Sequence, residues 1–167
     1  MTMRYYGQNG SQVLNAQAIF YLCYEALLET HLLTLEFVPR LATHWHISED
    51  KMTSKFRINP DARCWVGMPV TSDDVIATWE LLMDETILAP SYQITYSKFE
   101  RPIAESKYIV SVKANTINWR NFLYFATSMR LLPNHLLKDL DGTDYLKEYA
   151  FKVMTGTGPY IIRDENI

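Results

Sequence analysis

The sequence has few cysteines and no long hydrophobic run, and these absences exclude several kinds of protein. Its two cysteines, Cys23 and Cys64, match no metal-binding spacing and could form at most one disulfide. Because sequence alone cannot bring the two thiols together, buried free thiols are the expected state. No stretch is long and apolar enough to span a membrane. The first ten residues lack the apolar segment of a signal peptide, so none is expected in this chain.

Positive charge is also scarce. The 16 Lys and Arg residues are outnumbered by 19 Asp and Glu, which gives a net charge of -3. This balance argues against nucleic-acid binding, which requires a basic patch or stripe. The sequence contains neither a G-x-S-x-G elbow nor an H-E-x-x-H motif, and no nucleophile–base pair can be named. We therefore expect a protein that is not an enzyme and uses no cofactor.

The overall composition of the chain is that of a globular protein. Residues 1–167 are 48% hydrophobic and 21% charged, which fits one domain with a substantial core. Helical and hairpin patterns alternate along the chain, without repeats or linkers. This alternation predicts a mixed α+β or α/β fold with two β-hairpins packed against several helices.

The clearest local signal is a helix that starts near residue 71. Pro69 biases the preceding residue toward an extended conformation, so a strand or loop should end there. Thr71 stands at the N-cap position, and Asp74 follows three residues later, close to a capping box. Beyond them, Val75, Trp79 and Leu82 recur at helical spacing.

Weaker patterns predict the other elements. Helices are expected from residue 15 to residue 27, over 118–128, just after Pro133 and over 143–150. Hairpins are expected over 41–58, with a turn at 48–51, and around 105–112. Residues 85–100 are expected to be irregular, with a turn at Ala89–Tyr92, and a strand is expected over 160–163.

Three local patterns resemble chemical sites, and each has a better structural explanation. His44 and His46 share a strand face, but a metal site needs a third ligand and none lies nearby. Adjacent Asp73 and Asp74 do not face each other on a helix, so capping explains them better than acid catalysis. The Gly156–Gly158 segment precedes a predicted strand, whereas a phosphate loop precedes a helix. We therefore predict no metal site and no catalytic site.

Several ordered segments resemble one known family, the family 5 extracellular solute-binding proteins, which are the peptide- and nickel-binding components of ABC importers. Tyr24–Leu28 is similar to the family's "YEGLL", and Trp65–Val75 is similar to its "W-x-D-G-x-P-V-T-A-x-D-V". Pro39–Trp45 is similar to "P-x-L-A-x-S-W", and Ser48–Lys51 with Phe56–Pro60 is similar to "S-x-D-G … F-x-L-R/N-P". Leu132–His135 is similar to "L-P-K-H", and Gly156–Tyr160 is similar to "G-T/S-G-P-Y". Val66 and Lys51 depart from the family pattern, which affects local loops. The sequence of Asn59–Arg63 most resembles that of the oligopeptide-binding branch of the family.

The resemblance carries implications for fold and function. It implies a subdomain of the type II periplasmic-binding-protein-like fold, and an N-terminal fragment of a larger two-lobed protein. It implies that the intact protein captures oligopeptides or similar small solutes in the periplasm, or outside the cell while tethered to its surface, and delivers them to ABC permease subunits. It also aligns Tyr92 loosely with a ligand-facing tyrosine, although a tyrosine on a surface turn is an equal alternative.

A second hypothesis stays open at this point. The chain could be a stand-alone module that binds another protein through an exposed aromatic face. The aromatic content of 13% is compatible with both hypotheses.

Overall fold

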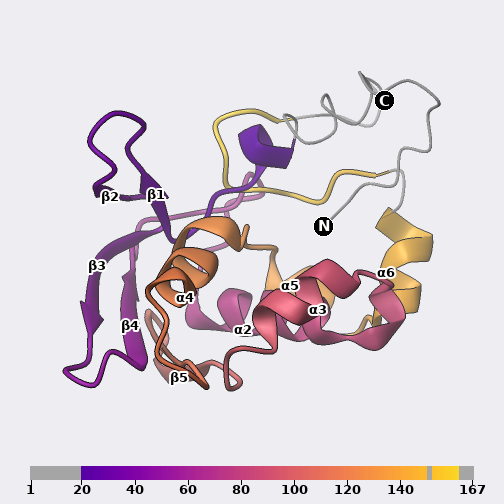
Figure 1. The fold of residues 1–167 in the computed structure, drawn as a ribbon. Helices are drawn as coiled ribbons and strands as arrows, with labels where there is room; N and C mark the ends of the chain where they lie inside the picture. Colours follow the sequence, from indigo (N-terminus) through magenta and orange to yellow (C-terminus); the bar gives the residue numbers. More distant parts are fainter. Residues whose placement is uncertain (1–19, 150–151, 162–167) are drawn as a thin grey trace.

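The computed structural model describes residues 20–149 and 152–161 (Figure 1). In this part of the chain, a two-stranded sheet and a four-stranded sheet are combined with several helices. In chain order the elements are β1 (Leu28–Thr30), β2 (Phe37–Pro39), β3 (Ala42–Ile47), β4 (Thr53–Ile58), α2 (Ser72–Met83), η1 (Glu85–Ile87), α3 (Pro90–Tyr96), β5 (Ile103–Ser106), β6 (Ile109–Lys113), α4 (Trp119–Leu123), η2 (Tyr124–Ser128), α5 (Asn134–Leu137) and α6 (Gly142–Tyr149).

The two predicted hairpins are confirmed, and together they form the larger sheet. Its strand order is β3-β4-β6-β5, with every neighbouring pair antiparallel. Phe56 is the central residue, because it pairs with Trp45 on one side and Val110 on the other. Phe56 and Val110 are buried, as alternation along each strand predicts for the face that meets the core.

The structure corrects the prediction that a helix continues to residue 27. Residues 20–23 are helical, but β1 begins at Leu28 and pairs with β2 in a hairpin that the sequence patterns did not indicate. Most of the predicted helix, from residue 15 to residue 19, lies outside the described residues. Ala26 and Leu27 are buried in a segment that is not helical, and their carbonyls accept hydrogen bonds from Leu41 N and Ala42 N at 3.3 and 2.9 Å. An apolar run of this length does not distinguish a helix from a buried extended segment.

Helix α2 begins as predicted, and its first turn connects distant parts of the chain. Thr71 is the N-cap, and its N–H donates to Asp74 Oδ2 at 2.6 Å. The Asp74 side chain is buried, and its other oxygen, Oδ1, accepts from Asn134 N at 2.7 Å. Further along α2, Thr78 Oγ1 accepts from Leu132 N at 2.9 Å. The segment that leads into α5 is therefore fixed to α2 at two points.

Helix α2 separates two hydrophobic clusters. Val75 and Leu82 belong to the larger cluster, which contains the buried face of the four-stranded sheet. Ala77 and Leu81 belong to the smaller one, which contains Tyr145 of α6. Figure 1 shows α2, α3, α5 and α6 grouped beside the sheet, with α4 in front of it. The mixed architecture of hairpins and helices agrees with the predicted fold class.

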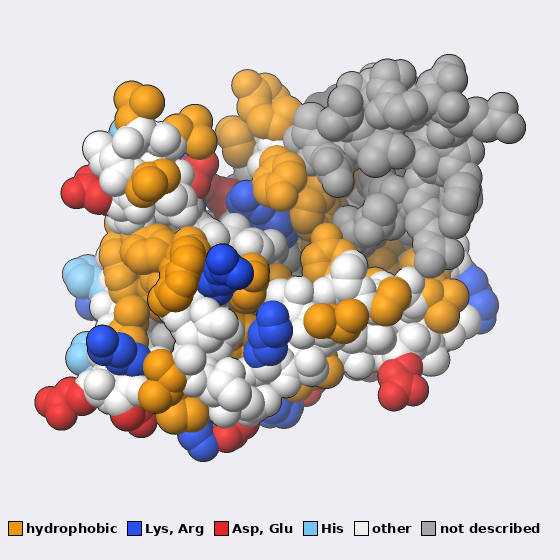
Figure 2. All heavy atoms as spheres, in the orientation of Figure 1, with side chains coloured by type: hydrophobic (Ala, Val, Ile, Leu, Met, Phe, Trp, Pro, Cys, Tyr) orange, Lys and Arg blue, Asp and Glu red, His pale blue; other side chains and the backbone are white. Residues whose placement is uncertain are grey.

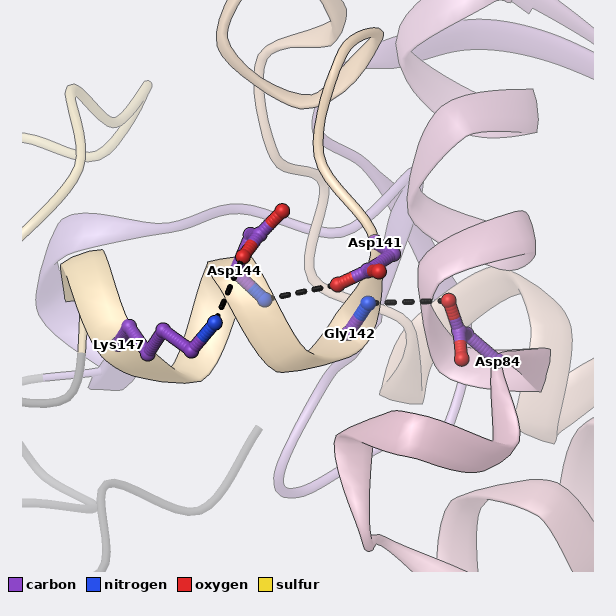
Figure 3. Close-up of polar contacts among 5 residues, drawn as sticks. All are labelled: Asp84, Asp141, Gly142, Asp144 and Lys147. Carbon is purple, nitrogen blue, oxygen red and sulfur yellow. Dashed lines mark hydrogen bonds and ion pairs between the residues drawn. The ribbon is translucent and has the colours of Figure 1, made fainter.

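The remaining predicted helices are present, with one irregularity. The helix expected over 118–128 consists of α4 followed by a π-helical turn, η2, and the helix after Pro133 is α5. The expected helix over 143–150 is α6, which begins at Gly142 and ends at Tyr149. Asp84 anchors its start, because Asp84 Oδ2 accepts from Gly142 N at 2.9 Å (Figure 3). The hydroxyl and the N–H of Thr86 also donate to Asp84 Oδ1, and these bonds, chiefly that of the hydroxyl, hold the pKa of Asp84 below its ordinary value.

Residues 152–161 return to the N-terminal part of the described chain. Gly158 N donates to Cys23 O at 2.9 Å, and Trp65 N donates to Gly156 O at 3.0 Å. A Cβ atom on Gly156 would lie 2.0 Å from Cys23 O, so this close backbone approach requires glycine. Tyr160 and Ile161 are not in a strand, and the rest of the predicted strand lies outside the described residues.

We predict that Asp74→Asn lowers the free energy of unfolding by roughly 1–3 kcal/mol, because it leaves two half-buried backbone donors, Thr71 N and Asn134 N, without a charged acceptor. Asp73→Asn is the matched control, since it makes the same change one residue earlier, at an exposed position. Urea denaturation followed by circular dichroism measures both variants. Equal losses for the two variants would show that only the helix dipole is involved, and would contradict the bridging role of Asp74.

Candidate functional site

Tyr92, the one residue for which the sequence suggested a ligand-facing role, lies on a helix rather than a surface turn. Residues 85–100 were expected to be irregular, and this prediction is wrong because η1 and α3 occupy much of the segment. Pro90 was interpreted as a turn residue, but it occupies the first turn of α3, where proline favours a helix start. Tyr92 is half-buried, and its ring stacks on that of Tyr96 at 6.3 Å between centroids.

A shallow crevice lies beside Tyr92. Thr78 and Leu82 of α2 form one wall, and the chain that follows η2, from Ser128 to Arg130, contributes to another. Its volume of about 10 Å³ is too small to enclose a solute. A ligand recognised here would therefore lie across the mouth of the crevice.

Arg130 is the charged residue of this crevice, and no sequence motif indicates it. Its guanidinium lies over the ring of Tyr21 at 4.6 Å, a cation–π geometry. Nη1 donates to Tyr24 O at 3.5 Å, whereas Nε is buried without a hydrogen-bond partner in the described part of the chain. Burial lowers the pKa of Arg130 from its ordinary value, and Tyr21, Glu29 and Glu25 oppose this shift.

The geometry around Tyr92 and Arg130 suits a ligand with an anionic group. A planar guanidinium with a spare donor binds a carboxylate in a defined orientation. Tyr21 is 59% exposed and offers an aromatic surface beside it. Tyr21, Tyr92 and Arg130 are far apart in the sequence, and no motif links them. The structure brings them together because α2 contacts α3 and holds the chain just after Arg130.

The other sequence candidates lie elsewhere and have structural surroundings. His44 and His46 are exposed on β3. No group of three His, Cys, Asp or Glu side chains among the described residues could hold a metal ion. Asp74 is a capping and bridging residue, and Gly156 and Gly158 pack against the backbone of Cys23.

The two cysteines are free and buried, as expected. Burial is the main cause, and nearby Asp74 a smaller one, that together raise the pKa of the Cys64 thiol to about 11. Burial also raises the pKa of Cys23. Because the thiolate is the nucleophilic form, both thiols are poor nucleophiles near neutral pH.

Comparison with known proteins identifies one family. The family model described as "Bacterial extracellular solute-binding proteins, family 5 Middle" matches residues 36–166. A protein of Brucella melitensis that is named only as a binding protein is 29% identical over 124 residues, which cover 73% of this chain and 19% of that protein. A protein of Brucella abortus with the same type of name matches to the same extent. The chain therefore spans about a fifth of the length of these relatives.

Solved structures share the fold. The oligopeptide-binding protein AppA of Bacillus subtilis, in complex with a nonapeptide, matches with a TM-score of 0.76 and 19% identity, over 95% of this chain and 30% of that chain. OppA of Haemophilus influenzae, in complex with the peptide RPPGFSPFR, matches with a TM-score of 0.70 and 22% identity, over 87% of this chain and 31% of that chain. NikZ of Campylobacter jejuni, in complex with Ni(L-His), has a TM-score of 0.69 and 19% identity, over 83% of this chain and 27% of that chain.

We predict that the free energy of unfolding falls as the pH rises above about 10, the ordinary pKa of tyrosine. Burial raises the pKa of both Tyr92 and Tyr96, so the folded chain keeps protons that the unfolded chain releases. Tyr92→Phe and Tyr96→Phe should each make this decline less steep, as urea denaturation at pH 7 to 11 would measure. The comparison at pH 7, where tyrosine is protonated in both states, isolates the packing effect of the lost hydroxyl. An unchanged slope in both variants would contradict the prediction.

Proposed function

We propose that this chain, which belongs to the bacterial extracellular solute-binding proteins of family 5, is part of a receptor that captures peptides or similar small solutes for uptake by an ABC transporter. The observation that carries the proposal is the family match over residues 36–166, which is most of the chain. It agrees with the motifs recognised in the sequence. The fold is that of the type II periplasmic-binding-protein-like neighbours, two of which hold peptides in their structures.

In this proposal, Tyr21, Tyr92 and Arg130 form one side of the solute site. The tyrosine rings would cover an apolar part of the solute, and Arg130 would pair with an anionic group. The crevice is too shallow to enclose a solute, so an opposing surface must complete the site. Such a surface would come from a second lobe of a longer protein, closing over the solute by hinge motion.

The proposed partners and location follow from the family. The family is extracellular, and we propose that the intact protein acts in the periplasm or tethered to the cell surface, where it meets ABC permease subunits. Within residues 20–149 and 152–161, no helix has the length and apolar character needed to cross a membrane.

The alternatives considered at the start have less support. A stand-alone interaction module is not supported, because the family match accounts for the motifs and the fold. The family consists of binding proteins rather than enzymes, and we propose no catalytic role for any residue of this chain.

Calorimetric titration with defined oligopeptides tests the proposal. We predict micromolar dissociation constants for a longer gene product that contains this chain, and weak or absent binding by residues 1–167 alone. In the longer product, Arg130→Gln and Tyr92→Ala should each raise the dissociation constant about tenfold or more, which corresponds to loss of about 1.4 kcal/mol.

Arg57→Gln is the matched control for Arg130→Gln, because Arg57 is exposed on β4 and outside the crevice. Micromolar binding by residues 1–167 alone would show that no opposing surface is needed. Equal effects of Arg130→Gln and Arg57→Gln would remove Arg130 from the site.

A further inference from the structure

A second concavity lies on another part of the molecule. A groove of about 650 Å³ runs between the four-stranded sheet and helix α4, a size typical of sites for small molecules. Its lining shares no residue with the crevice beside Tyr92. Figure 2 shows hydrophobic side chains gathered between β3 and α4, in the orientation of Figure 1.

The groove has an aromatic wall and an exposed apolar rim. Phe122 closes one side, because its ring packs against Phe37 and Phe56 with centroids at 4.8 and 5.7 Å. At the rim, Ile117 is 69% exposed and Trp119 is 72% exposed. Large apolar side chains exposed to water around an apolar concavity often mark an interaction site.

Asn121 places one buried polar group beneath the wall of the groove. The residue lines the groove, and its side chain is buried, with a relative exposure of 4%. Nδ2 donates to Thr116 O at 2.8 Å, which fixes the orientation of the amide, since the reverse orientation would place two oxygens together. Oδ1 is then a buried acceptor without a partner in the described part of the chain. A buried acceptor of this kind favours any occupant that brings a donor.

The charges at the mouth favour an uncharged occupant. Glu49 and Lys51 both line the groove and carry opposite charges, so the lining has no net charge that would attract a cation or an anion. We infer that this groove binds an uncharged, largely aromatic small molecule that carries one N–H or O–H donor for Asn121 Oδ1. Because Oδ1 is covered, binding must displace a side chain of the groove wall to reach it.

The test uses residues 1–167 and N-phenyl-1-naphthylamine, a neutral aromatic amine with one N–H, whose fluorescence rises in apolar surroundings. Saturable binding with one site per chain is expected. The N-methyl derivative, which lacks the donor, should bind about tenfold more weakly. In Asn121→Leu this preference should disappear, whereas a preference that persists would be steric and would overturn the role of Asn121.

Rim variants locate the binding site. Ile117→Asp and Trp119→Ala change exposed side chains and should each weaken binding at least tenfold, with unchanged circular dichroism. Ile103→Asp is the matched control, because Ile103 is 62% exposed on β5 and does not line the groove. Equal affinities in all three variants, or no saturable binding, would overturn the inference. So would a concentration-dependent dimer that Ile117→Asp abolishes, because a second copy would then cover the groove.

Discussion

The buried carboxylate of Asp74 is the interaction on which the arrangement of the helices depends. Oδ2 accepts a hydrogen bond from Thr71 N at the start of helix α2, and Oδ1 accepts one from Asn134 N, 60 residues later in the sequence. A buried carboxylate is costly unless donors surround it, so the chain must keep both partners in place. One side chain therefore fixes a local helix start and a long-range contact at once.

That constraint also places the candidate solute site. Thr78, one turn after Asp74, binds Leu132 N, and together these bonds hold the chain from Leu132 to Asn134 against α2. Arg130 lies just before this segment, and α3, which carries Tyr92, contacts the same helix. The position of Arg130 beside Tyr92 thus depends on bonds to α2 and on the contact of α3 with η2, which precedes Arg130.

The sequence made the start of α2 and the two hairpins predictable, because these features follow from local rules of capping and alternation. It did not predict β1, because the apolar run Ala26–Leu28 is equally compatible with one face of a helix and with a buried extended segment. The helix α3 was missed because Pro90 signals both a turn and a helix start. Arg130 was missed for a deeper reason, since burial of a lone arginine depends on tertiary contacts that no local pattern records.

The crevice beside Tyr92 and the groove beside α4 differ in how much of a site each one supplies. The groove has walls on several sides and enough volume for a small molecule. The crevice has aromatic rings and a partly desolvated guanidinium but almost no volume. Arg130 is partly removed from water and donates to the backbone carbonyl of Tyr24, and the nearby groups of Tyr21, Glu29 and Glu25 offset part of that cost. In the proposed site, an anionic group of the solute would offset the rest of this cost as the two faces close around it.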